Sequence, residues 1–180
     1  MFNKLIILVG FAVAGLMLTS CFDDNVITYD GPLQMEIKPG SVSAPNIQQG
    51  QPIVVSVQLI GPLQTETHTG SFNFVPDESF AVVSQNSATE DEGDFLYDIE
   101  YGTHFLLDGC DFTSTNTCEF EITPADSLVK DFVLTWNLDN IRTRSRNTVI
   151  FELQDEPAGA SYQVAPNLVR SVVQGTRGNN

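Results

Sequence analysis

The sequence predicts an all-β fold, built as a single antiparallel β-sandwich that follows an N-terminal targeting segment. Three observations support this prediction. Apolar and polar residues alternate at a period of two over many short stretches, which is typical of strands buried on one face. Turn-forming pairs such as Gly31-Pro32, Gly61-Pro62 and Thr123-Pro124 separate these stretches. After Cys21, no stretch shows a convincing period of 3.6 residues, the period of an amphipathic helix.

The predicted strands follow one another along the chain. In all of them but the last, every second side chain is apolar, so one face is expected to be buried. Trp136, the only tryptophan, lies between Leu134 and Leu138 on its own face, which predicts a core position. Stretches with this pattern are residues 53–59, 72–74, 118–122, 132–138 and 149–153, and residues 168–173 predict a last strand.

The pattern also sets the expected limits of the domain. We expect the sandwich to span residues 31–175 and a polar tail to cover residues 176–180. Residues 125–129 predict no more than one helical turn. A mature chain of this length is enough for one domain with a real core.

Residues 1–20 have the layout of a secretory signal peptide. One positive charge, Lys4, precedes an apolar run of fourteen residues, and the small residues Thr19 and Ser20 follow it. The alternative is a transmembrane helix, which needs about 20 apolar residues to cross the hydrocarbon core. The run is shorter than that and ends at Cys21, so we predict a signal peptide.

The end of this segment resembles the lipobox of bacterial lipoproteins, with Leu18, Thr19 and Ser20 before Cys21. The resemblance implies that Cys21 is acylated and becomes the mature N-terminus, with residues 21–30 as a tether. Two or three acyl chains would hold the domain at a membrane durably. Asp23 and Asp24 resemble the surface-export signals of Bacteroidota lipoproteins, although a solvated linker would look the same. We expect a lipid anchor in the outer membrane and the cell surface rather than the periplasmic face.

The net charge of the chain limits which binding partners are possible. The chain has 8 basic and 23 acidic residues, and removal of residues 1–20 takes away only Lys4, which leaves 7 against 23 and a formal charge of −16. Nucleic acid is therefore excluded as a partner, because phosphate binding needs a basic footprint.

If Cys21 is acylated, Cys110 and Cys118 remain, and in an oxidising compartment we predict a disulfide between them. Two free thiols or half a metal site are the alternatives.

Several stretches of the mature chain resemble Calx-beta-type sandwiches. Residues 147–160 (NTVIFELQDEPAGA), with the β stretch that follows, look like the end of such a domain. Residues 53–61 (IVVSVQLIG) and 102–107 (GTHFLL) look like the corresponding pieces in Bacteroidota surface lipoproteins. The resemblance covers about residues 33–174. It implies an immunoglobulin-like sandwich used for adhesion, display or carbohydrate-associated binding.

One loop departs from that family. Calcium-binding Calx-beta domains carry acidic residues before the penultimate strand, whereas this chain has Arg142, Arg144 and Arg146 there. On an extended backbone, side chains two residues apart point the same way, so the three guanidinium groups are expected to share one face. They would suit the carboxylates or sulfates of an acidic glycan. The alternative is that they neutralise the protein's own acidic surface.

Two further sets of residues are candidate ligand contacts. The densest acidic segment is residues 89–100. Tyr97 and Tyr101 lie beside this acidic loop and are candidates for exposed aromatic contacts. The segment itself supplies oxygen ligands of the kind that calcium takes, although a charged loop is more often simply solvated. We expect no cofactor, with calcium as the exception if this segment holds one. Its candidate metal ligands are Glu90, Asp91, Glu92 and Asp94.

The sequence offers no catalytic motif. His68 and His104 are the only histidines, and neither belongs to a zinc-type pair. We therefore predict a non-enzymatic, membrane-anchored module that binds a glycan or a protein partner. The alternative is a structural accessory subunit of an envelope complex with no small-molecule ligand. A binder should show a concave patch with converging arginines or exposed aromatics, and an accessory subunit a flat apolar patch.

Overall fold

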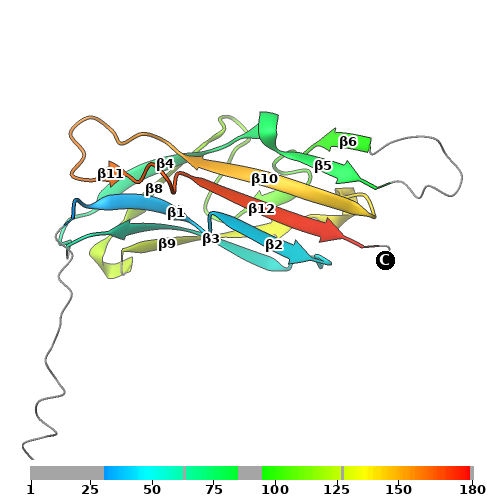
Figure 1. Ribbon diagram of the computed structural model, residues 1–180, viewed down its shortest axis with the longest axis horizontal. Coiled ribbons are helices and arrows are strands. Elements are labelled where there is room, and N and C mark those ends of the chain that lie inside the picture. The colour runs from blue at the N-terminus through cyan, green and yellow to red at the C-terminus, as the bar shows by residue number, and fades with distance from the viewer. Residues whose placement is uncertain (1–30, 63, 85–94, 127, 179–180) are drawn as a thin grey trace, which may run out of the picture.

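The protein is a two-layer, all-β sandwich, which confirms the predicted fold class. The computed structural model describes residues 31–62, 64–84, 95–126 and 128–178. Two sheets pack face to face over the length of the molecule, and their strands run along its long axis (Figure 1). The only helical elements described are three single turns of 3-10 helix: η1 (Pro76–Glu78), η2 (Pro124–Asp126) and η3 (Leu138–Asn140).

The first sheet has five strands, of which the central three are antiparallel. In spatial order they are β11 (Gln163–Val164), β1 (Gln34–Lys38), β3 (Pro52–Ile60), β9 (Val129–Trp136) and β7 (Phe105–Leu107). The register joins Val55 to Phe132 and Ile53 to Leu134. Both pairs face inward and are buried, which is what the period-two pattern predicts.

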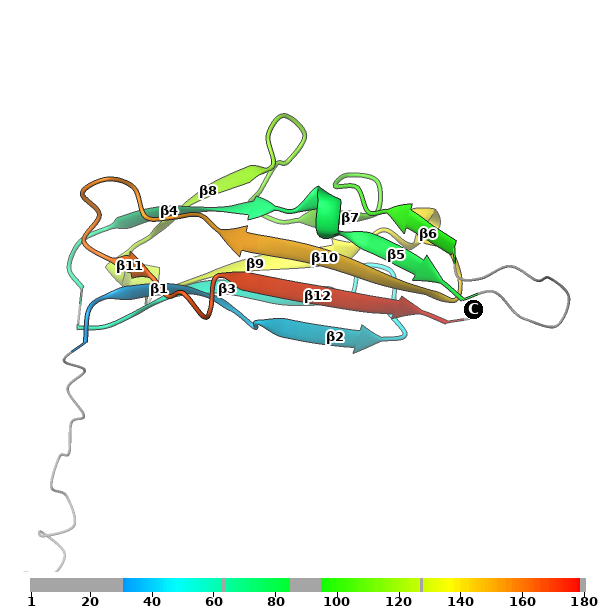
Figure 2. The ribbon, with the colours of Figure 1, turned by 45° about the horizontal axis from the view of Figure 1, so that its top comes forward.

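The second sheet has seven strands. Its main path runs through β2 (Ser41–Pro45), β12 (Arg170–Arg177), β10 (Ser145–Leu153), β4 (His68–Phe74) and β8 (Thr117–Ile122). The hairpin of β5 (Phe80–Val83) and β6 (Phe95–Asp98) joins β10 beyond the end of β4. Figure 2 shows β5 and β6 continuing the line of β4 past the turn η1.

The strand order is that of the immunoglobulin sandwich. In chain order the seven main strands are β1, β3, β4, β7, β9, β10 and β12, which places A-B-E-D in one sheet and C-F-G in the other. The chain crosses between sheets at Pro39: β1 pairs with β3 in the first sheet, and β2 pairs in parallel with β12 in the second. The sandwich expected from the Calx-beta resemblance is therefore present.

An aromatic cluster joins the inner faces of the two sheets. Phe72 of the second sheet meets Phe132 of the first edge to face, with ring centroids 4.9 Å apart. It also contacts Phe151 at 5.7 Å, within its own sheet. Trp136 is only 1% exposed and packs against Phe105, so its predicted core position is confirmed.

The predicted disulfide is also confirmed. Cys110 and Cys118 are bonded, with their Cα atoms 5.4 Å apart. Cys110 follows β7 at the edge of the first sheet and Cys118 lies in β8 at the edge of the second, so the bond closes the loop that connects them. A loop of this length is expected to gain about 2.5 kcal/mol of stability from the cross-link.

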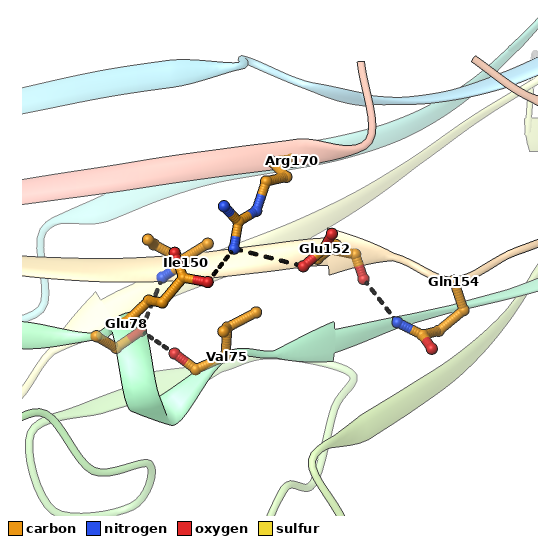
Figure 3. A network of polar contacts seen from close by, with 7 residues as sticks. Val75, Glu78, Ile150, Glu152, Gln154 and Arg170 are labelled. Atoms are coloured by element: carbon orange, nitrogen blue, oxygen red, sulfur yellow. Dashed lines mark hydrogen bonds and ion pairs between the residues drawn. The ribbon is translucent and has the colours of Figure 1, made fainter. Parts of the chain in front are cut away.

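On the outer face of the second sheet, an arginine bridges three elements. Arg170 of β12 donates to Glu78 of η1 at 2.7 Å and lies 3.4 Å from Glu152 of β10 (Figure 3). Beneath it, the Ser79 hydroxyl donates to the carbonyl of Val75 and accepts the N–H of Ile150. These contacts hold the turn between β4 and β5 against the sheet.

Three predicted boundaries are wrong. β12 continues through Arg177, so two residues assigned to the polar tail belong to the sheet. β9 ends at Trp136, and Leu138 begins η3 instead of extending the strand. The last strand begins at Arg170 rather than Leu168, whose N–H bonds to Ala165 in a turn. The errors at Leu138 and Leu168 fall where a turn uses apolar residues, which alternation cannot distinguish from strand.

The targeting segment and the tether, residues 1–30 with Cys21, lie outside the described residues. Within the described part of the chain, no helix is long and apolar enough to cross a membrane.

Close packing at Gly175 gives a test of the core. A Cβ placed there would lie 2.8 Å from two ring atoms of Trp136 and 3.0 Å from Ile47. Because both neighbours are buried, Gly175→Ala is expected to destabilise the fold by about 1–3 kcal/mol, measured by urea unfolding. At Gly40 the nearest atom is 3.9 Å away, so Gly40→Ala serves as the control and should stay close to the wild type. Equal unfolding midpoints for the two variants would contradict this packing.

Candidate functional site

Four arginines gather at one end of the sandwich. Arg142 and Arg144 lie between η3 and β10, Arg146 lies in β10, and Arg177 ends β12. The register joins Arg177 to Ser145 across the two strands. We call this group the arginine end. In Figure 1 it lies at the right, where β12 ends, and β1 begins at the opposite end.

The expectation that Arg142, Arg144 and Arg146 lie on one extended strand is wrong. Arg144 adopts a left-handed conformation with φ of 58°, in a turn. Only Arg146 belongs to a strand. All three side chains are exposed, but they project from a turn and a strand end rather than from one pleated face.

Internal hydrogen bonds hold the turn that carries Arg142. The guanidinium of Arg177 donates to the carbonyls of Leu138 and Ile141. The Ser145 hydroxyl donates to the carbonyl of Arg142 at 2.6 Å. These bonds satisfy carbonyls at the start of η3 and just after it, and they fix the position from which Arg142 projects.

Tyr97 contacts Arg142, although sequence analysis singled out the two only as separate ligand-binding candidates. The Tyr97 hydroxyl donates to Oδ1 of Asn147 at 3.0 Å and accepts the N–H of Arg142 at 3.4 Å. The Arg142 guanidinium lies 5.9 Å from the centroid of the Tyr97 ring, within cation–π range. Asn147 is fully buried and donates to the carbonyl of Gly175 at 3.0 Å. A buried asparagine thus anchors the tyrosine on which the arginine rests.

Tyr101 lies apart from this group and has a different partner. Its hydroxyl donates to the carbonyl of Cys110 at 2.7 Å, and its ring packs edge to face on Phe105 and Phe112. Burial, together with the charge of Asp111, raises the pKa of Tyr101. The structure therefore ties Tyr101 to the disulfide loop and does not bring it to the arginine end.

The candidate calcium ligands Glu90, Asp91, Glu92 and Asp94 lie outside the described residues. Their segment connects β5 to β6. Ser84, just before it, donates its N–H to the carbonyl of Arg144 at 3.0 Å. Among the residues that the structure does describe, no group of three or more His, Cys, Asp or Glu side chains is arranged to hold a metal ion.

His104 contributes to the same end of the molecule, which the sequence did not predict. It is 8% exposed, its ring centroid lies 5.4 Å from that of Tyr97, and its Nδ1 accepts the N–H of Glu100 at 2.9 Å. Burial lowers the pKa of His104, and the nearby Glu100 opposes this only in part. His68 lies elsewhere, packed on Tyr162 with its Nδ1 3.3 Å from the Ser161 hydroxyl. Both histidines are buried.

Three hollows lie on the side of the molecule that carries the β7–β8 loop, and carboxylates line all of them. The first, of about 550 Å³, contains Glu119, Glu121 and Asp155. The second, of about 480 Å³, contains Asp111 and Glu119. A third, of about 650 Å³, is lined by Asp77, Asp98 and Glu100 together with Tyr101. No arginine lines any of the three, contrary to the concave, arginine-lined patch expected of a glycan binder.

The outer face of the first sheet carries an apolar strip that sequence analysis did not single out. Val54 and Leu106 are 47% and 51% exposed. Val54 lies directly opposite Val133, and Leu106 lies opposite Thr135, which in turn faces Pro52. The sequence showed that Val54 and Leu106 alternate with buried residues. It did not show that these outward-facing side chains lie next to one another and form an apolar group.

Comparison with known proteins adds no family. No family model matches the sequence, and no curated protein matches it. Solved structures with a similar fold include the apo-form Calx CBD1 domain, at 12% identity and a TM-score of 0.45, over 81% of this chain and 98% of that one. The PapD-like domain 7 of human CEP192 is 10% identical with a TM-score of 0.42, over 79% of this chain and 84% of that one. A chain of a type I cohesin–dockerin complex from Clostridium thermocellum is 7% identical with a TM-score of 0.39, over 83% of this chain and 97% of that one. At such low identities and TM-scores, no ligand or partner is transferred to this chain.

Burial of His104 gives an expected pH dependence. Because its pKa is lower in the folded than in the unfolded chain, where it is about 6.5, the neutral side chain favours folding. The stability that His104 contributes is complete when the pH is above its pKa in the unfolded chain, and it is lost as the pH falls through its pKa in the folded chain. His104→Asn keeps an acceptor for the Glu100 N–H but does not titrate. We expect a smaller fall in melting temperature between pH 7.5 and pH 5 for this variant than for the wild type; parallel curves would contradict the assignment.

Proposed function

We propose that this protein is a lipid-anchored, non-catalytic binding module whose arginine end recognises an acidic partner. The anchor is the acylated Cys21. The ligand groups are carboxylates or sulfates, carried by a glycan chain or by an acidic surface of another protein. Guanidinium groups suit such ligands because their planar donors bind two oxygens at once.

One observation carries the proposal: four of the eight basic residues in the chain, Arg142, Arg144, Arg146 and Arg177, lie at one end of a molecule with a net charge of −15. The charge is concentrated where the strands give way to loops, the region that sandwich domains commonly use for recognition. Most of this surface would repel an acidic ligand, so these guanidinium groups are its expected contacts.

The arginine end is also held in place before any ligand arrives. Arg177 and Tyr97 form hydrogen bonds to the backbone of the turn, and the Tyr97 ring contacts Arg142. Asn147 in turn accepts a hydrogen bond from the Tyr97 hydroxyl. Binding then costs less conformational entropy, which favours affinity without a deep cavity.

The described hollows favour a large ligand over a small one. Small molecules bind in concave sites that bury most of their surface. The three carboxylate-lined hollows would repel an anion, and none borders the arginines. A polymeric acid or a protein surface can instead lie across the end of the sandwich.

The position of the arginine end suits display from a membrane. β10 spans nine residues, about 30 Å, from the arginine end towards the end where β1 begins. With the anchor attached ahead of β1, recognition takes place at the end remote from the point of attachment.

A second candidate function is favoured by a different observation. The apolar strip of Val54, Leu106 and Val133 is the kind of flat surface that an accessory subunit would pack against a neighbour. This reading requires no ligand at the arginine end, so the experiment below separates the two.

A thermal melt of the full chain in detergent tests the proposal. Probes are a sulfated oligosaccharide, a polyglutamate peptide and a neutral glycan of equal length. A ligand that binds only the folded state at a hundredfold excess over its dissociation constant raises stability by about 2.7 kcal/mol. We expect a shift with one of the two acidic probes, and none with the neutral glycan.

Variants assign the shift to its site. Arg142→Ala combined with Arg144→Ala should abolish it, and Arg142→Lys with Arg144→Lys should weaken it, because the charge remains but the planar fork is lost. Lys130→Ala, remote from the arginine end, is the matched control. A shift that survives the double alanine variant would refute the site, and no shift with either acidic probe would leave the accessory subunit as the better account.

A further inference from the structure

The outer edge of β8 carries unpaired backbone groups. Among the described strands, β8 pairs only with β4. The N–H of Gln154 bonds to the carbonyl of Ser71, so the backbone groups of Ser71 point towards the β10 side of β4. The residues before and after Ser71 in β4 therefore point their backbone groups towards β8. Gly70 therefore exchanges hydrogen bonds with Phe120, its register partner.

In β8, the residues on either side of Phe120 point their backbone groups away from β4. Because an antiparallel strand directs successive backbone groups to opposite sides, the N–H and C=O of Glu119 and Glu121 face outward. No backbone hydrogen bond from another described residue reaches them on that side. Thr117 differs, since the Thr115 hydroxyl bonds to its carbonyl at 3.3 Å. The open stretch is thus centred on the two glutamates.

The surroundings of this edge are acidic. Both glutamate side chains are exposed and border the first hollow, whose lining also includes Asp155 and Pro157. Glu119 also borders the second hollow, with Asp111. No lysine or arginine lines either hollow. The acids form no metal-binding group among the described residues, so the charge is not explained by a cation site there.

A second copy of this chain is a poor occupant of the edge. Edge strands commonly carry charges that prevent copies from pairing with one another. In an antiparallel pair of β8 strands the glutamates of both copies would lie on the same two-strand surface, in a chain with a net charge of −15. Such repulsion blocks self-association, but it would attract a strand of opposite charge.

We propose that the open edge of β8 accepts an extended, basic segment of a partner protein as an added strand. Backbone hydrogen bonds form to Glu119 and Glu121, and lysines or arginines at every second position of the segment lie beside these two carboxylates. The geometry sets this spacing, because alternate side chains of an added strand share one face. The site lies on β8, away from the arginine end, so it stands or falls independently of the function proposed above.

The probe is a fluorescent octapeptide that alternates lysine with threonine or valine, titrated against the full chain in detergent at physiological salt. Two matched peptides replace each lysine with glutamate or N-methylate the backbone amides along one edge. We expect binding of the lysine peptide only, with hydrogen exchange at residues 117–122 slowed by about tenfold or more.

Protein variants separate the backbone from the charge. Glu121→Pro removes an outward N–H while leaving the ladder to β4 intact, because proline is tolerated where the amide faces away from the neighbour. Glu119→Gln with Glu121→Gln removes two charges and keeps the backbone. Each is expected to weaken binding about tenfold. The control, Asp131→Asn with Asp139→Asn, removes two exposed acids elsewhere and should bind as the wild type does.

Three results would overturn the proposal. The first is no binding of the lysine peptide. The second is equal binding of the N-methylated peptide, which would mean attraction by charge without strand addition, and this holds even if Glu121→Pro fails to fold. The third is unchanged binding to the glutamine variant, which would move the peptide to another surface.

Discussion

The packing of Phe72 against Phe132 is the contact on which the architecture depends, because it joins the two sheets at the centre of the molecule. Burying a side chain of this size contributes about 1.5–3 kcal/mol, and the neighbouring aromatic residues add to it. Each strand must direct alternate side chains inward to form this core. The outward side chains, the strand edges and the loops are then the only parts left for recognition, so the functional surfaces of the protein follow from its core.

Those surfaces carry different chemistry because they have different structural support. The arginine end is supported from within: buried Asn147 holds Tyr97, which supports Arg142, and Gly175 allows Trp136 to pack closely beneath. The edge of β8 is supported by the disulfide, since Cys118 lies in that strand and its bond to Cys110 ties the strand to the loop from the other sheet. A basic end and an acidic edge on one scaffold would let the module contact two partners of opposite charge.

The fold could be predicted from the sequence because alternation is a local signal. The strand around Val149 and the position of Trp136 followed from it, and the disulfide followed from counting cysteines. The site could be predicted only in part, since it depends on contacts between residues far apart in the chain. Tyr97 and Arg142 were chosen singly, but their contact depends on Asn147, and the left-handed turn at Arg144 uses no glycine that would have signalled it. The open edge of β8 arises from sheet order, which the sequence does not state.

The central claim is that this protein binds acidic partners through the arginine end. Hydrogen–deuterium exchange of the full chain, with and without the acidic probe that shifts its melt, tests it most directly. We expect slower exchange over residues 138–147, where the turn carries Arg142 and Arg144, and unchanged exchange over β8 at residues 117–122. Protection confined to β8 or to the outer face of the first sheet, or no protection anywhere, would contradict it.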